Sequence, residues 1–443
     1  MDRWGPAWDR IYLGATAGGS RLARPEDAVL VLGPPRSGKT SSLVVPNVAI
    51  GRGAVVSTST KTDVLEATLD ARRAMGTCWL FDPTGKLAPP QGVERLRWSP
   101  LAEADDWEAA LRVARVTVGA ARPDDRDPHW KERAESVLAV LLHAAARAGG
   151  SMSDVVSWIN RRDERPALAQ LAVDGSPLAA EHLAGVMASE PRELSGVWST
   201  VSSIVSCYRS AASLESASPA NFAPVRFAAS TDTVYICAAG IDQATVAPVI
   251  SALVSTIVNA RYEANRGDRS LPPMLLALDE VANIAPLPEL PSIVAEGGGQ
   301  GVLMLACLQD LSQARRRWGP QADGFLTLFG GKVLLPGVSD PATLRAVSEM
   351  CGEVEARSPS GGWAGGRMSL GWSGRPRRRL PSDRIREGKP GAALVIEGAS
   401  PPGWVRLTPA HADRGWRGRM EELARGHERD RSPLPSGRGR PAR

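Results

Sequence analysis

The chain has 443 residues, of which 43% are hydrophobic and 23% charged, an ordinary globular balance with enough length for two or three domains. At this length the chain can bury a large hydrophobic core. Its net charge of +5 permits a nucleic-acid partner without requiring one. Five scattered cysteines indicate a reduced, cytosolic compartment, and no His/Cys spacing suggests a metal site, so any metal is expected to be Mg²⁺ carried with a nucleotide.

The first segment, residues 1–27, is predicted to be a short, Gly-rich lead-in. Its polar start does not resemble a signal peptide, and its aromatic residues are available to pack on a domain edge: Trp4, Trp8 and Tyr12. Further along, Gln243–Ala260 is the stretch nearest in apolarity to a membrane span. It carries several polar residues, and a buried amphipathic helix is therefore the better interpretation.

The segment Ala28–Thr40 organises the rest of the chain. Ala28–Leu32 is an apolar run typical of a buried parallel strand, and residues 33–40 read Gly-Pro-Pro-Arg-Ser-Gly-Lys-Thr, which matches the P-loop pattern G-x-x-x-x-G-K-[ST]. Residues 41–50 follow with apolar side chains at helical spacing, although Pro46 is expected to bend that helix. The order strand, loop, helix is the context that the motif needs.

The residue types of this loop suit a polyphosphate. Small residues let successive backbone N–H groups converge on phosphate, and the helix that follows adds partial positive charge. Lys39 is expected to reach the β- and γ-phosphates, and the Thr40 hydroxyl to ligate Mg²⁺. The sequence therefore predicts a site for ATP and Mg²⁺ formed by Gly33, Pro34, Pro35, Arg36, Ser37, Gly38, Lys39, Thr40 and Ser41.

Strands and helices alternate after the P-loop, and then the pattern changes. Residues 54–59 and 77–81 are predicted strands that flank a helix over residues 64–75, which indicates βαβ units and a parallel sheet. From about Pro100 to Ser216 the strand signals disappear. Apolar residues at three- and four-residue spacing predict that this part is an all-helical insert.

Strand signals return after the insert, at Val225–Ala228 and Thr233–Cys237. The apolar run Met274–Leu278 ends at Asp279-Glu280, which is the Walker B pattern. Asp279 is expected to hold Mg²⁺, and Glu280 to polarise the attacking water. The alternative is an ordinary strand followed by a capping acid.

Another buried strand, Gly301–Leu308, ends at Gln309. A glutamine at the tip of a strand beside Walker B is suited to bond the γ-phosphate or the lytic water and to report its loss. The alternative is an exposed, polar strand end. Further along, Gly330–Leu335 and Ala392–Glu397 are predicted strands, and Pro341–Cys351 is a predicted helix.

Two later segments are unusual in composition. Glu355–Arg379 is rich in Gly, Ser and Arg and indicates a loop or a loose hairpin. Its basic cluster and aromatic residues favour single-strand or backbone binding as much as a solvated surface loop: Arg375, Arg377–Arg379, Trp363 and Trp372. Residues 411–443 are Arg-, Gly- and Pro-rich and are predicted to be a disordered tail.

Several stretches together resemble the coupling proteins of conjugative type IV secretion systems, the TraG/TraD group of P-loop ATPases. The resemblance covers roughly Ile11 to Leu407, and the stretch at 57–63 and the helical insert make it specific. The matching features are the P-loop followed by Val44-Val45-Pro46-Asn47, the stretch Ser57-Thr58-Ser59-Thr60-Lys61-Thr62-Asp63 followed by Arg72 or Arg73, Gly76 and Phe81-Asp82-Pro83, the helical block, and Leu278-Asp279-Glu280 with Gln309 thirty residues beyond Asp279.

The resemblance implies an α/β fold: a RecA-like P-loop NTPase domain with a mostly parallel central sheet, interrupted by an all-α inserted domain. The expected organisation is a lead-in at 1–27, a motor domain at 28–99 and 220–410, the insert at 100–219 and the tail at 411–443. The resemblance also implies a homo-hexameric DNA translocase that links a relaxase–DNA complex to secretion-channel proteins. Such a protein is expected in the cytoplasm, at the inner face of the cell membrane.

The chain departs from the family pattern in two ways. Family members usually carry N-terminal transmembrane helices, and none is found here, so a partner supplies the anchor, the chain is a soluble relative, or the gene start is misplaced. Membrane contact is therefore expected only indirectly or through a missing anchor. The stretch between Walker B and Gln309 also lacks the arginine that is expected to act across a subunit interface; Arg315–Arg317 are either its substitute or an exposed helix face.

Together these patterns predict an ATP-hydrolysing, DNA-stimulated coupling protein. Its catalytic residues are Lys39, Glu280 and Gln309, and its Mg²⁺ ligands are Thr40 and Asp279. The alternative is a non-translocating, nucleotide-binding scaffold that recruits secreted protein substrates through the helical insert. A chromosome-type double-strand translocase is a weaker option, because the chain after Ala410 is too short for a winged-helix reader.

Overall fold

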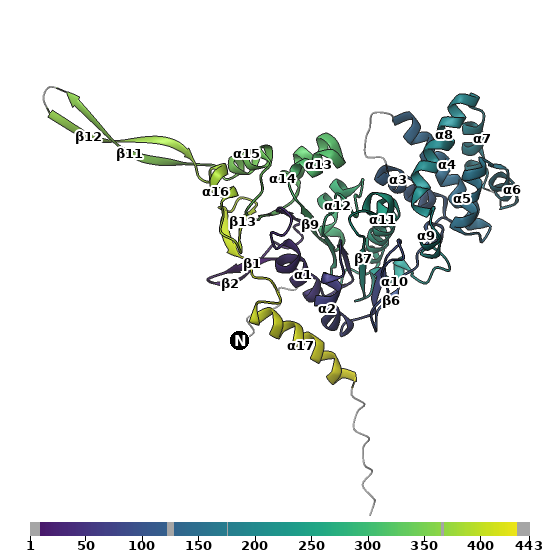
Figure 1. Cartoon of the computed structure of the whole chain (residues 1–443), viewed down its shortest axis with the longest axis horizontal. Helices are drawn as coiled ribbons and strands as arrows, with labels where there is room; N and C mark the ends of the chain where they lie inside the picture. Colours follow the sequence, from purple (N-terminus) through teal and green to yellow (C-terminus); the bar gives the residue numbers. More distant parts are fainter. Residues whose placement is uncertain (1–8, 122–127, 175, 365–366, 432–443) are drawn as a thin grey trace, which may run out of the picture.

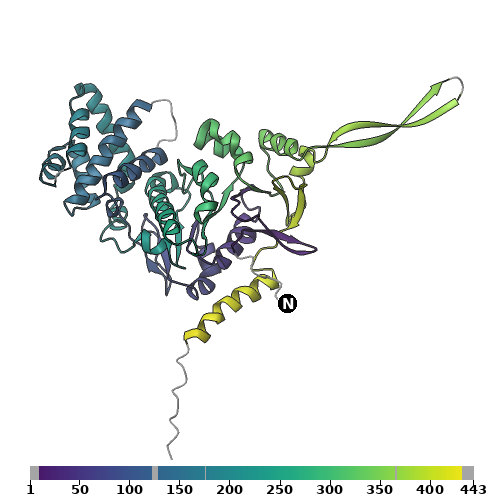
Figure 2. The ribbon, with the colours of Figure 1, turned by 180° about the vertical axis from the view of Figure 1, so that it is seen from behind.

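The computed structural model describes residues 9–121, 128–174, 176–364 and 367–431, excluding the side chains of residues 174, 356–375 and 426–431. These residues form a body around a central sheet, with a group of helices at one end and a long hairpin that projects from the other (Figure 1). Figure 2 shows the same arrangement from behind.

Within the described residues, twelve strands form one sheet. All neighbouring pairs from β10 across to β6 are parallel, and β13, β14, β1 and β2 extend one edge with antiparallel pairs. This mostly parallel sheet confirms the predicted α/β class. From edge to edge the strands are β2 (Gly19–Leu22), β1 (Tyr12–Thr16), β14 (Gly403–Arg406), β13 (Ala392–Glu397), β10 (Gly331–Leu334), β3 (Val29–Leu32), β9 (Val302–Leu308), β8 (Met274–Leu278), β4 (Val55–Ser59), β7 (Thr233–Cys237), β5 (Cys78–Phe81) and β6 (Glu94–Arg95).

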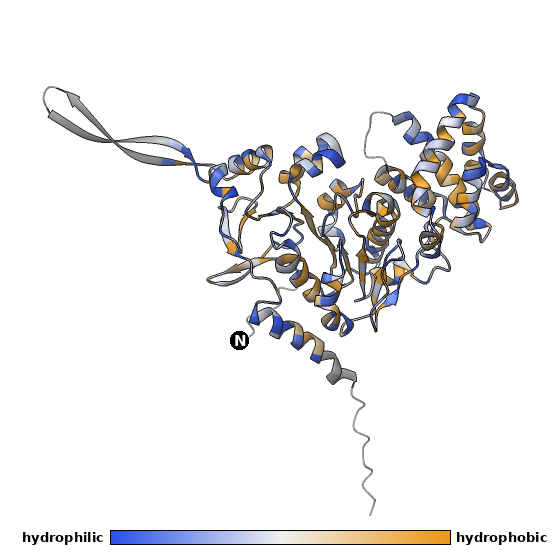
Figure 3. Ribbon diagram, in the orientation of Figure 1, coloured by the Kyte–Doolittle hydropathy of each residue, from blue (hydrophilic) through white to orange (hydrophobic). Residues whose placement is uncertain are grey.

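The central strands are buried on both faces. In β3, Leu30 and Leu32 belong to one apolar cluster, whereas Val29 and Val31 belong to the cluster on the opposite face. Successive side chains of a strand point to opposite faces, so a strand covered on both sides is apolar throughout, as β3 is. Figure 3 shows the hydrophobic residues gathered along the sheet and on the helices that cover it.

Helices cover each face. The face that includes Val29 and Val31 packs against the first helices of the chain and the last one: the π-helical turn Thr40–Val44, α1 (Val45–Ile50), α2 (Asp63–Arg73) and α17 (Arg414–Arg431). The opposite face packs against the remaining helices of the body: α3 (Trp107–Ala121), α10 (Pro224–Ala228), α11 (Gln243–Gly267), α12 (Leu290–Glu296), α13 (Leu311–Trp318), α14 (Phe325–Leu328), α15 (Pro341–Met350) and α16 (Ser382–Arg386).

The segment between β6 and β7 contains only helices and turns among its described residues. Its central helix, α4 (Pro128–Arg147), is almost wholly buried from Val137 to Ala145. Helices α5 to α8 surround α4 at the end of the molecule opposite the hairpin (Figure 1). These helices are α5 (Met152–Arg161), α6 (Arg165–Asp174), α7 (Pro177–Met187) and α8 (Pro191–Ile204), and the short α9 (Ala211–Glu215) follows.

Helix α11 is the described helix whose length and apolarity would allow it to cross a membrane, with a mean hydropathy of 1.4 in its most apolar window. Of that window, 78% is buried inside the fold. Helix α11 packs along α3 and α10 on one face of the sheet. The prediction of a buried helix over Gln243–Ala260 is confirmed.

The prediction of a lead-in at residues 1–27 is wrong for its described part, because residues 12–22 form the hairpin β1–β2 at the edge of the sheet. Asn47, in the helix after the P-loop, holds this hairpin. Its Oδ1 accepts from the Tyr12 N–H at 2.8 Å, and its Nδ2 donates to the Tyr12 carbonyl at 3.0 Å. Trp4 and Trp8 lie outside the described residues.

Two further predictions of secondary structure need correction. Val225–Ala228 is not a strand: Pro224 opens the short helix α10, and Phe227 and Ala228 are buried on its inner side. Proline suits the first position of a helix, and a short apolar run does not by itself distinguish strand from helix. The predicted disordered tail is wrong for its first half, because Arg414–Arg431 form helix α17.

The segment predicted as a loop or loose hairpin is a long antiparallel hairpin, β11 (Glu353–Ala364) and β12 (Arg367–Arg378). It projects from the body next to α15 (Figure 1). Arg377 and Arg378 are exposed at its base, as is Arg379, which follows it. The side chains of Trp363, Trp372 and Arg375 lie outside the described part.

Arg72, one of the two arginines after the 57–63 stretch, is fully buried in α2. Its guanidinium donates to Thr233 Oγ1 at 2.7 Å and to the carbonyls of Thr231 at 2.9 Å, Gly53 at 3.2 Å and Gly51. Burial lowers its pKa. Arg72 therefore joins the starts of β4 and β7, a structural role.

Candidate active site

The carboxyl ends of three neighbouring parallel strands meet at one edge of the sheet. In the sheet, β9 lies between β3 and β8. The P-loop follows β3, Asp279 follows β8, and Gln309 follows β9. In open α/β sheets, ligands bind at this edge. The fold therefore gathers there three stretches that are far apart in the sequence.

Two glycines permit the shape of the P-loop. A Cβ on Gly33 would lie 2.8 Å from Ser37 Oγ and 3.0 Å from Leu335 Cβ, so no larger residue fits without a shift. Gly38 has φ +95°, in the region that side chains disfavour. The loop thus closes tightly on itself before the helix begins.

The polar groups of the loop fit a polyphosphate. Lys39 is 6% exposed, and its Nζ donates to two carbonyls of the loop itself, those of Gly33 at 2.6 Å and Pro34 at 3.1 Å. Ser37 Oγ is shielded from solvent and has no hydrogen-bond partner among the described residues. Among the described residues, the Lys39 ammonium makes no ion pair and the Ser37 hydroxyl makes no hydrogen bond, and both therefore suit an anionic ligand.

Thr40 and Asp279, which are 239 residues apart, are in direct contact. Thr40 Oγ1 donates to Asp279 Oδ2 at 2.5 Å, and the carbonyl of Asp279 accepts from Thr58 Oγ1 at 2.8 Å. Burial raises the pKa of the Asp279 carboxyl, and Glu280 acts in the same direction, whereas Thr40 and Lys39 lower it. A hydroxyl and a carboxylate side by side are hard oxygen donors of the kind that Mg²⁺ takes.

Glu280 has a left-handed backbone, with φ +53°. Such a conformation costs a non-glycine residue about 1–3 kcal/mol and is often found at functional sites. The Glu280 N–H donates to Asp279 Oδ1 at 3.1 Å, and Asn283 Nδ2 donates to Glu280 Oε2 at 3.2 Å. The half-buried Glu280 carboxylate is therefore held beside Asp279.

Gln309 lies at the tip of β9, between the P-loop strand and the Walker B strand. Its backbone N–H donates at 2.8 Å to Oε1 of Gln313, which lies in the first turn of α13. The structure places Gln309 at the shared strand edge, but it is not among the residues that line the pocket beside the P-loop.

A pocket of about 580 Å³ opens beside the P-loop and is lined by four parts of the chain. Sequence reasoning identified only the loop residues 36–41 as ligand-binding. In the sequence Asp63 was noted only as the end of the 57–63 stretch. Residues 411–443 were predicted to be a disordered tail, and Ala410 was the last residue of the predicted motor domain. The other lining residues are Val45 of α1, Asp63 and Ala67 of α2, and Ala410, His411, Arg417 and Met420 of the C-terminal segment.

The three arginines of α13 differ in their surroundings. Arg315 pairs with Asp323 at 2.9 Å and with Asp340 at 3.7 Å. Arg317 donates to the carbonyl of Ala120 at the end of α3, and burial lowers its pKa to about 10. Arg316 is exposed and has no ion pair within the described residues.

Comparisons with known proteins identify the family and the fold. A family model described as "Type IV secretory system Conjugative DNA transfer" matches residues 6–364. Among curated proteins, none matches.

Solved structures show the same fold. The bacterial conjugative coupling protein TrwBdeltaN70, in an unbound monoclinic form, is 19% identical with a TM-score of 0.69, covering 90% of this chain and 88% of that one. The plasmid coupling protein TrwB in complex with ADP and Mg²⁺ is 18% identical with a TM-score of 0.68, covering 90% and 89%. Its complex with the GTP analogue GDPNP is 18% identical with a TM-score of 0.66, covering 87% and 86%.

These similarities confirm the RecA-like P-loop NTPase fold. The family model spans most of the chain, including the P-loop, the Walker B strand and Gln309. The chain therefore belongs to the conjugative DNA transfer family of type IV secretory systems.

Proposed function

We propose that this chain is an ATP-hydrolysing coupling protein that recruits DNA, or a relaxase–DNA complex, and helps translocate it into a type IV secretion channel. The observation that carries the proposal is the contact between Thr40 and Asp279. It brings the end of the P-loop into direct contact with the end of the Walker B strand, as the two halves of a triphosphate site require.

Each residue of the site has a proposed role. The loop N–H groups and Lys39 hold the phosphates, while Thr40 and Asp279 hold Mg²⁺, which neutralises phosphate charge when bound. Glu280 orients the attacking water, and Gln309 passes the state of the γ-phosphate to the neighbouring strands. Catalysis then depends on positioning and electrostatics.

We also propose how the chain is divided into domains. Residues 28–99 and 220–410 form the motor, and residues 100–219 form an inserted all-α domain that recruits cargo. Support comes from the shape of the molecule, since α4 to α8 lie beyond the end of the sheet (Figure 1). The β1–β2 hairpin and α17 pack on the motor and are assigned to it.

The proposed working form is a homo-hexamer in contact with DNA and with channel proteins, in the cytoplasm at the inner face of the cell membrane. In such a ring, exposed Arg316 is the candidate to act on the pocket of the neighbouring subunit. Its two neighbours in α13 are already engaged within their own chain.

ATP turnover with and without DNA tests the proposal. We expect single- or double-stranded DNA to raise the turnover of the wild-type protein several-fold. Lys39→Ala should lower it at least about 100-fold, because the variant loses a charge that stabilises the developing phosphate charge. A matched control is Lys389→Ala, an exposed lysine outside the P-loop pocket, which should keep wild-type turnover.

Two outcomes would contradict different parts of the proposal. Wild-type turnover in Lys39→Ala would refute the site. Suppose instead that Lys39→Ala loses turnover, but that wild-type turnover does not respond to DNA and the wild-type protein stays monomeric. That result would refute the motor and favour the nucleotide-binding scaffold.

A further inference from the structure

The C-terminal segment forms one side of the pocket beside the P-loop, some 370 residues further along the chain. We propose that residues 410–420 bind the base and ribose of the nucleotide and thereby set the affinity for the nucleoside part of ATP. This inference rests on the proposed function, because it assumes that the P-loop holds the phosphates.

A single proline explains why the segment docks at this place. The helix after the P-loop begins as a π-helical turn, in which the Val45 N–H bonds to the carbonyl of Thr40. In that pattern the carbonyl of Ser41 would accept from residue 46, but Pro46 has no N–H. The freed Ser41 carbonyl accepts instead from the Ala410 N–H at 2.8 Å.

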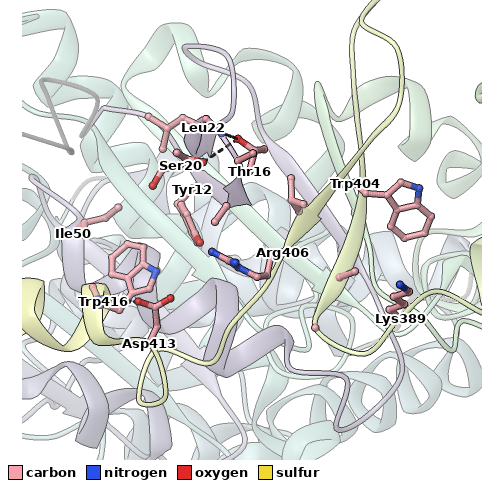
Figure 4. Close-up of a pocket in the computed structure, with 18 of the residues that line it drawn as sticks. Tyr12, Thr16, Ser20, Leu22, Ile50, Lys389, Trp404, Arg406, Asp413 and Trp416 are labelled. Carbon is pink, nitrogen blue, oxygen red and sulfur yellow. Dashed lines mark hydrogen bonds between the residues drawn. The ribbon is translucent and has the colours of Figure 1, made fainter.

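An aromatic contact fixes the start of α17. Trp416 is 3% exposed and packs edge-on against Tyr12, with ring centroids 5.0 Å apart and an interplanar angle of 74°. Asp413 Oδ1 accepts from the N–H groups of Gly415 at 2.8 Å and Trp416 at 3.2 Å, which caps the first turn. Figure 4 shows Tyr12, Trp416 and Asp413 converging at a neighbouring cavity.

With its start fixed, α17 packs against α2 (Figure 1), and its residues Arg417 and Met420 line the pocket. Ala67 of α2 and Met420 of α17 add apolar surface to the lining of the pocket. Arg417, one turn before Met420, is exposed and makes no ion pair with the described residues. His411 adds a ring with a donor and an acceptor nitrogen.

This lining matches the chemistry of a nucleoside better than that of a phosphate. A base needs a flat apolar surface and a few polar groups at its edge, and a site of roughly 300–1,000 Å³ is typical of small ligands. Methionine adapts to flat ring systems, and a guanidinium stacks on them or bonds to their edges. The 580 Å³ pocket has both among the residues that α17 contributes to its lining.

Binding of ATP and of tripolyphosphate, which has no base or ribose, tests the inference. In the full-length double variant His411→Ala/Arg417→Ala we expect the Kd for ATP to rise about tenfold and the Kd for tripolyphosphate to stay the same. Met420→Ala should weaken ATP several-fold in the same selective way. Arg425→Ala, an exposed arginine further along α17 and outside the pocket, is the matched control and should bind both as the wild type does.

Measuring both ATP and tripolyphosphate distinguishes a failure of this inference from a failure of the proposed function. Lys39→Ala should weaken ATP and tripolyphosphate alike, and failure of that result would overturn the proposed site. If Lys39→Ala behaves as expected while the double variant binds ATP as tightly as the wild type, the role of the C-terminal segment is refuted and the P-loop site stands. Equal loss of both probes in the double variant would also refute it, because the segment would then act on phosphate.

Discussion

Two sides of the pocket beside the P-loop are built in opposite ways. On one side, one continuous stretch, residues 33–41, supplies the loop, and its shape follows from Gly33 and Gly38. On the other side, residues 410–420 reach the pocket through contacts with Ser41, Tyr12 and α2. A backbone requirement within one loop restricts the residue types at fixed positions, so the loop can be recognised in the sequence. The docking of a remote helix leaves no such local pattern.

The largest effect on ATP turnover is expected from Arg316, which does not line the pocket. If rings form, Arg316→Ala should lower ATP turnover about 1,000-fold, because a trans-acting arginine stabilises charge in the transition state. Arg315→Ala, which removes a cation already paired within the chain, should change turnover far less.

Mixed rings sharpen this test. Lys39→Ala and Arg316→Ala subunits are each inactive alone, but a mixture should regain turnover. In it, the intact pocket of an Arg316→Ala subunit meets the Arg316 of a Lys39→Ala neighbour. If the mixture stays inactive, Arg316 does not act across the interface, and turnover of Arg316→Ala at the wild-type rate would exclude any role.

A smaller effect on turnover, about 100-fold, is expected for Asp279→Asn, which weakens the Mg²⁺ ligand. This variant should also melt at a higher temperature than the wild type at neutral pH. Burial raises the pKa of Asp279 in the folded protein, so the folded state disfavours the ionised carboxylate that the unfolded state accepts. Asparagine removes that penalty.

The direction of the pKa shift of Asp279 predicts how the difference in melting temperature between Asp279→Asn and the wild type depends on pH. As the pH falls through the raised pKa of Asp279, the folded wild-type protein takes up the proton and loses the penalty, so the difference in melting temperature should shrink. Asp383→Asn, at an exposed carboxylate of α16, should show no such change. A difference that grows towards low pH would contradict the raised pKa.

The smallest effect on turnover is expected from the C-terminal segment. Trp416→Ala should cost about 3 kcal/mol of unfolding free energy, because it leaves a cavity beside Tyr12. It should also weaken ATP several-fold without affecting tripolyphosphate, since α17 loses its anchor. Trp404→Ala, at a tryptophan that is 42% exposed, is the control and should cost under about 1 kcal/mol. Unchanged stability in Trp416→Ala would show that α17 docks by other contacts.

Much of the sheet was predictable from local composition. The strands at β3, β4, β5, β8, β9, β10 and β13 are apolar runs that end at polar or turn residues, as strands buried on both faces must be. The antiparallel strands β1, β2 and β14 and the edge strand β6 were not predicted. They are short and only partly buried, so their sequences carry neither a continuous apolar run nor a clear alternation.

The sequence alone determined the P-loop, the parallel sheet and the family, because a P-loop and a strand covered on both faces each restrict residue types at fixed spacing. Only the tertiary structure decided that Asp279 contacts Thr40, that Arg72 joins the starts of β4 and β7, and that the last helix lines the pocket. Those outcomes depend on pairwise contacts between distant segments. A single proline that leaves the Ser41 carbonyl free can direct such a contact without leaving any signal near residue 410.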